Sequence, residues 1–239
     1  MSSLNYTTYI NQISNLLVIA STDSSFTTML PGMIDYAEQR IYRELDLLAT
    51  RVTDATASLS AGERNFNLPT DQGTYIVVEE VNVITPASES ADTGTRIPLT
   101  YVSRPFLDTC YPTNSSGTNT PIFFTMNDDT SIIVGPTPDG NYNLEITGTQ
   151  RPTSLSTGNS STFLTSNLPD LFIAASMVFG SGYQRDFSAQ GDNPQQAQSW
   201  ENQYQLLKNS ANVEEIRKKY YSQGWTSKQP SPLASPPRV

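Results

Sequence analysis

Residues 26–48, FTTMLPGMIDYAEQRIYRELDLL, carry the strongest structural signal in the sequence. Apolar side chains recur here every three or four residues, which is the period of one face of an α-helix. Asp23 and Ser24 precede the stretch as candidate N-terminal caps, and charged residues occupy the opposite face. Pro31 and Gly32 interrupt the run. We therefore expect a break or kink at this point, followed by a stronger helix from Pro31 to about Leu48.

Further helices are predicted toward both ends of the chain. Residues 4–17 fit a short amphipathic helix. Asn167 is a candidate cap for a helix that begins at Pro169 and carries an apolar stripe, and Pro194 begins another helix. The same segment includes small residues that permit close packing between helices: Ala174, Ala175, Ser176, Gly180, Ser181 and Gly182.

Between residues 50 and 165 the composition changes to short β-prone runs separated by Pro, Gly, Asn, Asp and Ser. Turn signals lie at Asn127-Asp128-Asp129 and at Pro138-Asp139-Gly140-Asn141. Short antiparallel strands at this spacing predict a small sandwich or barrel. The clearest runs are Tyr75–Ile84, Ile97–Val102, Ile122–Met126, Ser131–Val134 and Tyr142–Thr149.

These segments predict an α+β fold. We expect a helical bundle built from N- and C-terminal helices, an inserted antiparallel β-sandwich or barrel domain, and an extended C-terminal tail. The predicted segments are residues 1–49 and 166–224 for the bundle, 50–165 for the β-domain, and 225–239 for the proline-rich arm.

The arm holds four prolines and too few apolar residues to form a core. A frayed terminus is an equally weighted interpretation. Against it, a proline-rich strap loses less entropy on docking, and a tryptophan directly after the last predicted helix is typical of interface anchors. The candidate partner-binding residues of the arm are Trp225, Lys228, Leu233, Arg238 and Val239.

The residue inventory argues against an enzyme. Histidine is absent, and Cys110 is the single cysteine, which we expect to be a small buried hydrophobe. The carboxylates Asp128 and Asp129 are better explained by a turn than by acid–base chemistry. We therefore expect no catalytic residue, no cofactor and no metal site.

The charge distribution bears on nucleic acid. The net charge is −9, and residues 50–165 hold twelve Asp or Glu against five Arg and no Lys, a net of −7. An acidic body disfavours tight binding to phosphates, and it suits a surface that DNA passes without sticking. Simple solubility explains the charge equally well. No apolar run approaches a membrane span, and no secretion signal is apparent at the N-terminus, so we expect synthesis in a cytoplasm and no membrane.

Several stretches, in this order, resemble one family. The chain is similar to the head-to-tail adaptor, or connector, proteins of short-tailed bacteriophages and related phages. The resemblance rests on the helix Ala37–Leu45, the turn Leu68-Pro69-Thr70-Asp71, the strands around Thr120–Phe124 and Ile132–Asp139, and the return segments Leu155-Ser156 and Leu168-Pro169-Asp170-Leu171.

The resemblance implies a structural virion protein at the head–tail interface, made in the host bacterial cytoplasm. It implies a homo-oligomeric ring of twelve copies, with the helical bundle beneath the portal protein and a docking surface for a downstream tail, nozzle or fibre protein. DNA would pass through the channel without specific binding during genome ejection. In such adaptors the C-terminal arm commonly packs against the portal, and none of the family's residues is catalytic.

A second interpretation is a β-sandwich binding module, such as a tail-fibre-joining or carbohydrate-recognising tail protein. It requires an aromatic groove in the β-domain and leaves the long terminal helices unexplained, so it ranks second. A hydrolase ranks third. The aromatic candidates for the groove are Tyr75, Tyr101, Phe123 and Phe124.

Overall fold

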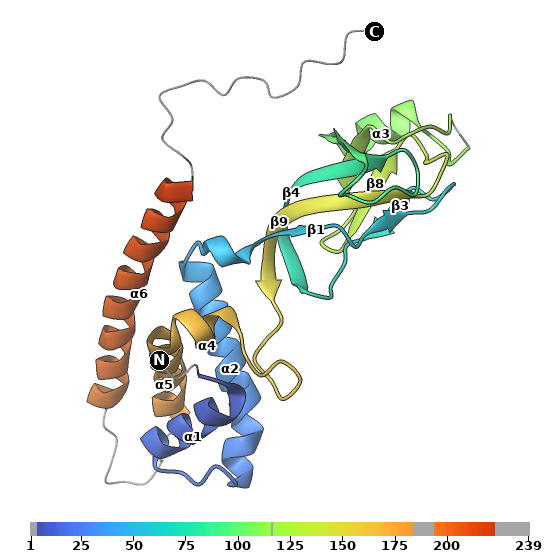
Figure 1. The fold of residues 1–239 in the computed structure, drawn as a ribbon. Helices are drawn as coiled ribbons and strands as arrows, with labels where there is room; N and C mark the ends of the chain where they lie inside the picture. Colours follow the sequence, from blue (N-terminus) through green and yellow to red (C-terminus); the bar gives the residue numbers. More distant parts are fainter. Residues whose placement is uncertain (1–3, 116, 184–193, 223–239) are drawn as a thin grey trace.

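The computed structural model describes residues 4–115, 117–183 and 194–222. It contains both helices and largely antiparallel sheets, which confirms the predicted α+β class. The helices α1, α2, α4, α5 and α6 gather at one end, and the strands extend to the other end, where the short α3 lies (Figure 1). In chain order, two helices precede the strands and three follow them.

The elements have the following bounds. The helices are α1 (Tyr6–Leu17), α2 (Ser24–Glu44), the 3-10 turn η1 (Leu48–Thr50), α3 (Arg104–Cys110), α4 (Phe163–Asn167), α5 (Pro169–Tyr183) and α6 (Pro194–Ser222). The strands are β1 (Arg51–Asp54), β2 (Ser58–Leu59), β3 (Asn65–Asn67), β4 (Gly73–Thr85), β5 (Thr95–Pro98), β6 (Thr100–Tyr101), β7 (Phe123–Met126), β8 (Ser131–Gly135) and β9 (Tyr142–Pro152).

One hydrophobic core joins the helices from the two ends of the chain. Its largest fully buried side chains include Tyr9, Phe26, Phe172 and Tyr204, from four different helices. The rings of Tyr9 and Phe172 stack with centroids 4.9 Å apart. The Tyr9 hydroxyl donates to Ser176 Oγ at 2.8 Å, so the one polar atom of this buried ring has a partner.

Helix α2 runs without interruption through Pro31, so the predicted break there is wrong. Of the two candidate caps, Asp23 is the cap, and its side chain accepts hydrogen bonds from Ser25 N and Phe26 N. Proline removes one helical hydrogen bond, but Leu30 and Met33 on either side are buried in the common core. Their packing holds the helix together across the gap. The helix ends at Glu44, a turn earlier than the predicted end near Leu48.

At the start of α5 the predicted capping residue is wrong. Pro169 does occupy the first helical position, but Asn167 is the last residue of α4 and its Nδ2 donates to Phe163 O. The close helix approach involves some, but not all, of the predicted small residues. Ala174 and Ala175 are buried as expected, whereas Gly182 is exposed. The tight contact is at Gly180, where an added Cβ would meet Leu17 Cδ2 at 3.2 Å.

The strands form two sheets. The first has the order β1-β9-β4-β5, with β2 also paired to β9, and the second has the order β3-β8-β7-β6. The long strands β4 and β9 pair along most of their length and run from the helices toward the far end (Figure 1). A second hydrophobic core, with Val81, Phe124, Ile132 and Leu144 among its members, draws residues from both sheets.

Sequence reasoning located the longer strands and missed the shorter elements. Strands β4, β7, β8 and β9 lie where they were expected, while β1, β2, β3 and α3 were not predicted. The predicted run Ile97–Val102 divides into β5 and β6, which belong to different sheets. The expectation of purely antiparallel pairing is also wrong, because β6 pairs parallel with β7.

The carboxylate of Asp128 organises the turn between β7 and β8. It accepts hydrogen bonds from Ser131 Oγ at 2.7 Å and from both Thr130 N and Thr130 Oγ1 at 2.8 Å. The bonds from Ser131 and Thr130 lower the pKa of Asp128 to about 2. These contacts explain Asp128 as turn chemistry, as the sequence indicated.

Candidate assembly surfaces

Helix α6 is attached to α2 by a charged seam. Arg40 donates from Nη1 to Glu201 Oε2 at 2.8 Å and from Nη2 to Glu201 Oε1 at 2.6 Å. Its guanidinium carbon also lies 4.1 Å from the ring centroid of Tyr204. The bond to Glu201 raises the pKa of Arg40, and the same bond lowers the pKa of Glu201. A two-point charge-assisted contact of this kind fixes orientation as well as adding energy.

Glu44 forms the second part of the seam. Its carboxylate accepts from Arg40 Nε at 3.0 Å, from the Tyr204 hydroxyl at 3.1 Å, and it pairs with Lys208 Nζ at 3.0 Å. Burial alone would raise the pKa of Glu44, but the bonds from Lys208, Arg40 and Tyr204 lower it overall.

The C-terminal half of α6 holds the chain where it leaves α2. Glu215 is buried, and its Oε2 accepts a hydrogen bond from Leu48 N at 3.0 Å. Lys218 pairs with both Glu215 and Glu214, and Lys219 pairs with Asp46. Together with the seam, these contacts fix which face of α6 turns inward and which turns outward.

The outward face of α6 carries an exposed apolar row, which we call the α6 stripe. Leu206 and Tyr220 are each 72% exposed, and Val213 and Ile216 are exposed as well. Leu206, Val213 and Tyr220 are seven residues apart, so they lie nearly in line along the helix. This row was not predicted from the sequence, although its seven-residue spacing is visible there.

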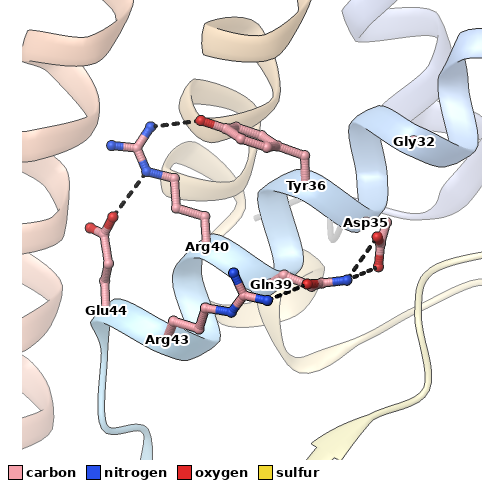
Figure 2. Close-up of a pocket in the computed structure, with 7 residues that line it drawn as sticks. All are labelled: Gly32, Asp35, Tyr36, Gln39, Arg40, Arg43 and Glu44. Atoms are coloured by element: carbon pink, nitrogen blue, oxygen red, sulfur yellow. Dashed lines mark hydrogen bonds and ion pairs between the residues drawn. The ribbon is translucent and has the colours of Figure 1, made fainter.

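A groove of about 500 Å³ runs along the outer side of α2, and we call it the α2 groove. Figure 2 shows Asp35, Gln39 and Arg43 following one another along the helix: the Gln39 amide donates to Asp35, and Arg43 donates to Gln39 Oε1. Within the described part of the chain neither Asp35 nor Arg43 has an ion-pair partner. The lining residues are Gly32, Asp35, Tyr36, Gln39, Arg40, Arg43 and Glu44.

The residues proposed from the sequence fall in two groups. The arm residues Trp225, Lys228, Leu233, Arg238 and Val239 lie outside the described residues. The aromatic residues required by the second interpretation do not share one exposed groove. Tyr75 and Phe124 are buried in the β-core, and Tyr101 packs edge-on against Phe124 with centroids 5.4 Å apart.

Cys110, expected to be buried, is exposed because it lies at the end of the short helix α3 on the surface. Among the described residues no group of three or more His, Cys, Asp or Glu is arranged to hold a metal ion. In the same part of the chain, no helix is long and apolar enough to cross a membrane.

The comparison with protein families decides the identity. The model of the SU10 adaptor protein family matches residues 4–228, which include every helix and strand described above. The chain belongs to the SU10 adaptor protein family. Membership confirms the resemblance to phage head-to-tail adaptors that was drawn from short motifs. The chain matches no curated protein.

For a member of the SU10 adaptor family, the surfaces of interest are those on which other phage proteins can assemble. The family implies a virion component that associates with phage portal and tail proteins. The α6 stripe and the α2 groove are therefore surfaces on which partners are to be sought.

Proposed function

We propose that this protein is a non-enzymatic head-to-tail adaptor that forms a ring of twelve copies below the portal, extends the DNA channel, and docks tail or nozzle proteins. The observation that supports the proposal most strongly is the family match over residues 4–228, because it covers both the helical and the sheet elements. In this proposal, the helices from both ends of the chain act as the bundle that forms the ring. The two sheets form the inserted β-sandwich that faces outward or toward the tail.

The ring is tested by electron microscopy of the purified protein with and without purified portal rings. We expect annular particles or added density beneath the portal. Monomers alone, together with bare portal rings in the mixture, would contradict the proposal.

The C-terminal arm is proposed as the strap to the portal. Trp225 and Leu233 would supply apolar anchors, Lys228 and Arg238 would meet acidic groups of the portal, and Val239 ends the arm. Deleting residues 225–239 should then weaken binding to portal rings, and Trp225→Ala should reproduce part of that loss. Undiminished binding after the deletion would exclude the strap. Lys228→Arg, which keeps the charge, is the matched control and should bind normally.

The acidic composition of residues 50–165 supports passage of DNA without specific binding, because like charges repel phosphates. Mobility-shift measurements with duplex DNA at low salt test this property. Tight binding at about 50 mM salt would contradict it.

A further inference from the structure

We infer that the α6 stripe of one copy packs into the α2 groove of a second copy of this chain. The inference rests on the proposed ring, and it specifies which two faces form the contact between neighbouring subunits. Its basis is the geometry of α6, the shape of the α2 groove, and two charges that form no ion pair within the described part of the chain.

The α6 stripe cannot be covered by α2 of its own copy. Tyr204 faces the seam with α2, and Leu206 follows it by two residues, which is about 200° around an α-helix. The stripe therefore points away from the helical core. A row at seven-residue spacing is suited to another helix, whose side chains would alternate with those of the stripe.

The α2 groove has the shape to receive such a row. Gly32 lies at its end, and a Cβ added there would meet nothing within 4 Å. Tyr36 is 38% exposed beside it and offers an apolar wall. The missing side chain at Gly32 leaves room for a large residue from the neighbouring helix.

Charge complementarity favours a second copy as the occupant. Arg217 is exposed beside the stripe, four residues after Val213, and it makes no ion pair within the described part of the chain. Asp35 in the groove is exposed, and among the residues that the structure describes, the side chain that donates hydrogen bonds to its carboxylate is Gln39. The two opposite charges would meet when the stripe enters the groove.

The two faces belong to different helices and do not overlap. Each copy can therefore present its stripe to one neighbour and its groove to the other. Such a contact is heterologous, and it closes into a ring when the rotation between copies allows.

Charge reversal tests the inference on the full-length chain. Asp35→Arg and Arg217→Asp should each raise the protein concentration needed for half-assembly by about tenfold, measured by light scattering after size exclusion. The double variant should recover to within about threefold of wild type. Glu63→Arg makes the same charge change as Asp35→Arg at an exposed site in the loop between β2 and β3, and it should assemble normally.

A cross-linking experiment gives a readout independent of affinity. In a Cys110→Ser background, Val213→Cys combined with Gly32→Cys or with Gln39→Cys should give a ladder of covalent oligomers on oxidation. A ladder with Gly32→Cys would indicate that α6 of one copy and α2 of its neighbour run parallel. A ladder with Gln39→Cys would indicate that the two helices run antiparallel. Val213→Cys alone should give no ladder beyond dimer.

The outcomes separate this inference from the proposed function. Wild-type rings with unaffected charge variants and no ladder would overturn the inference and leave the ring intact. Charge variants that keep the ring but lose portal binding would also overturn it, because the stripe would then face the portal. A wild-type chain that never assembles, alone or on portal rings, would overturn both.

Discussion

The carboxylate of Glu38 on α2 accepts a hydrogen bond from Leu155 N across 3.0 Å, and both residues are buried. Leu155 lies just after β9, where the chain returns to the helices. Glu215 likewise accepts a hydrogen bond from Leu48 N, where the chain leaves the helices for β1. A buried glutamate thus holds each of these two connections between helices and sheets. Glu38 comes before the strands in the sequence and holds the connection after them, whereas Glu215 comes after the strands and holds the connection before them.

Glu38→Ala should lower the free energy of unfolding by about 1–3 kcal/mol, because the buried Leu155 N–H loses its acceptor. Glu38→Gln keeps an acceptor oxygen in the same place and is the matched control. Urea unfolding measures the difference, and hydrogen exchange should become faster at Leu155 in the alanine variant alone. Equal stability of the two variants would show that the hydrogen bond does not matter.

Glu38 should also give the protein a specific pH dependence. Burial raises the pKa of this carboxyl, and the hydrogen bond from Leu155 offsets only part of the rise. The folded state therefore holds the proton more tightly than the unfolded chain. The contribution of Glu38 to stability is fully present below the pKa of the unfolded chain, about 4.3. It is lost as the pH rises through the raised pKa of the folded state.

The stability of Glu38→Gln relative to wild type should accordingly increase from acid to neutral pH. Glu44 and Glu201, whose pKa values are lowered, drive the opposite trend, but they are present in both proteins and cancel in the comparison. Unfolding curves at several pH values provide the measurement. A difference that stays constant with pH would mean that Glu38 titrates normally.

The sequence predicted those elements whose hydrophobic pattern extends over many residues, because such a pattern outweighs a single exception such as a proline. The three/four spacing of α2 survives Pro31 because its apolar residues bury together in one core. The strands β1, β2 and β3 escaped prediction because each is two to four residues long. Their place is set by pairing with β8 and β9 and not by a pattern of their own.

The candidate surfaces were less predictable than the fold. The sequence places Glu214 and Lys218 four residues apart on one helix, a spacing that allows the ion pair that the structure contains. It gave no sign that Arg40 reaches Glu201, because the two residues are 161 positions apart. Contacts of this kind depend on how two helices pack, and a single sequence reports periodicity within a helix but not the register between helices.

Arg40→Lys should lower the free energy of unfolding by about 1 kcal/mol, because lysine keeps the charge and loses both the two-point contact with Glu201 and the planar contact with Tyr204. Glu201 is partly exposed, so solvent screening keeps the loss modest. A double-mutant cycle with Glu201→Gln should give a coupling energy of about 0.5–1 kcal/mol. Additive effects would show that the seam is not a coupled unit.

Val18→Gly should stabilise the protein by about 1 kcal/mol. Val18 ends α1 with φ 56° and ψ 37°, a left-handed conformation that is costly for a β-branched residue. Its side chain is 90% exposed, so glycine sacrifices little packing, and the closing bond from Ile19 N to Ser14 O can remain. Val18→Ala keeps the Cβ and should gain clearly less in thermal and urea unfolding. If alanine stabilised as much as glycine, the left-handed backbone would not be the source of the gain.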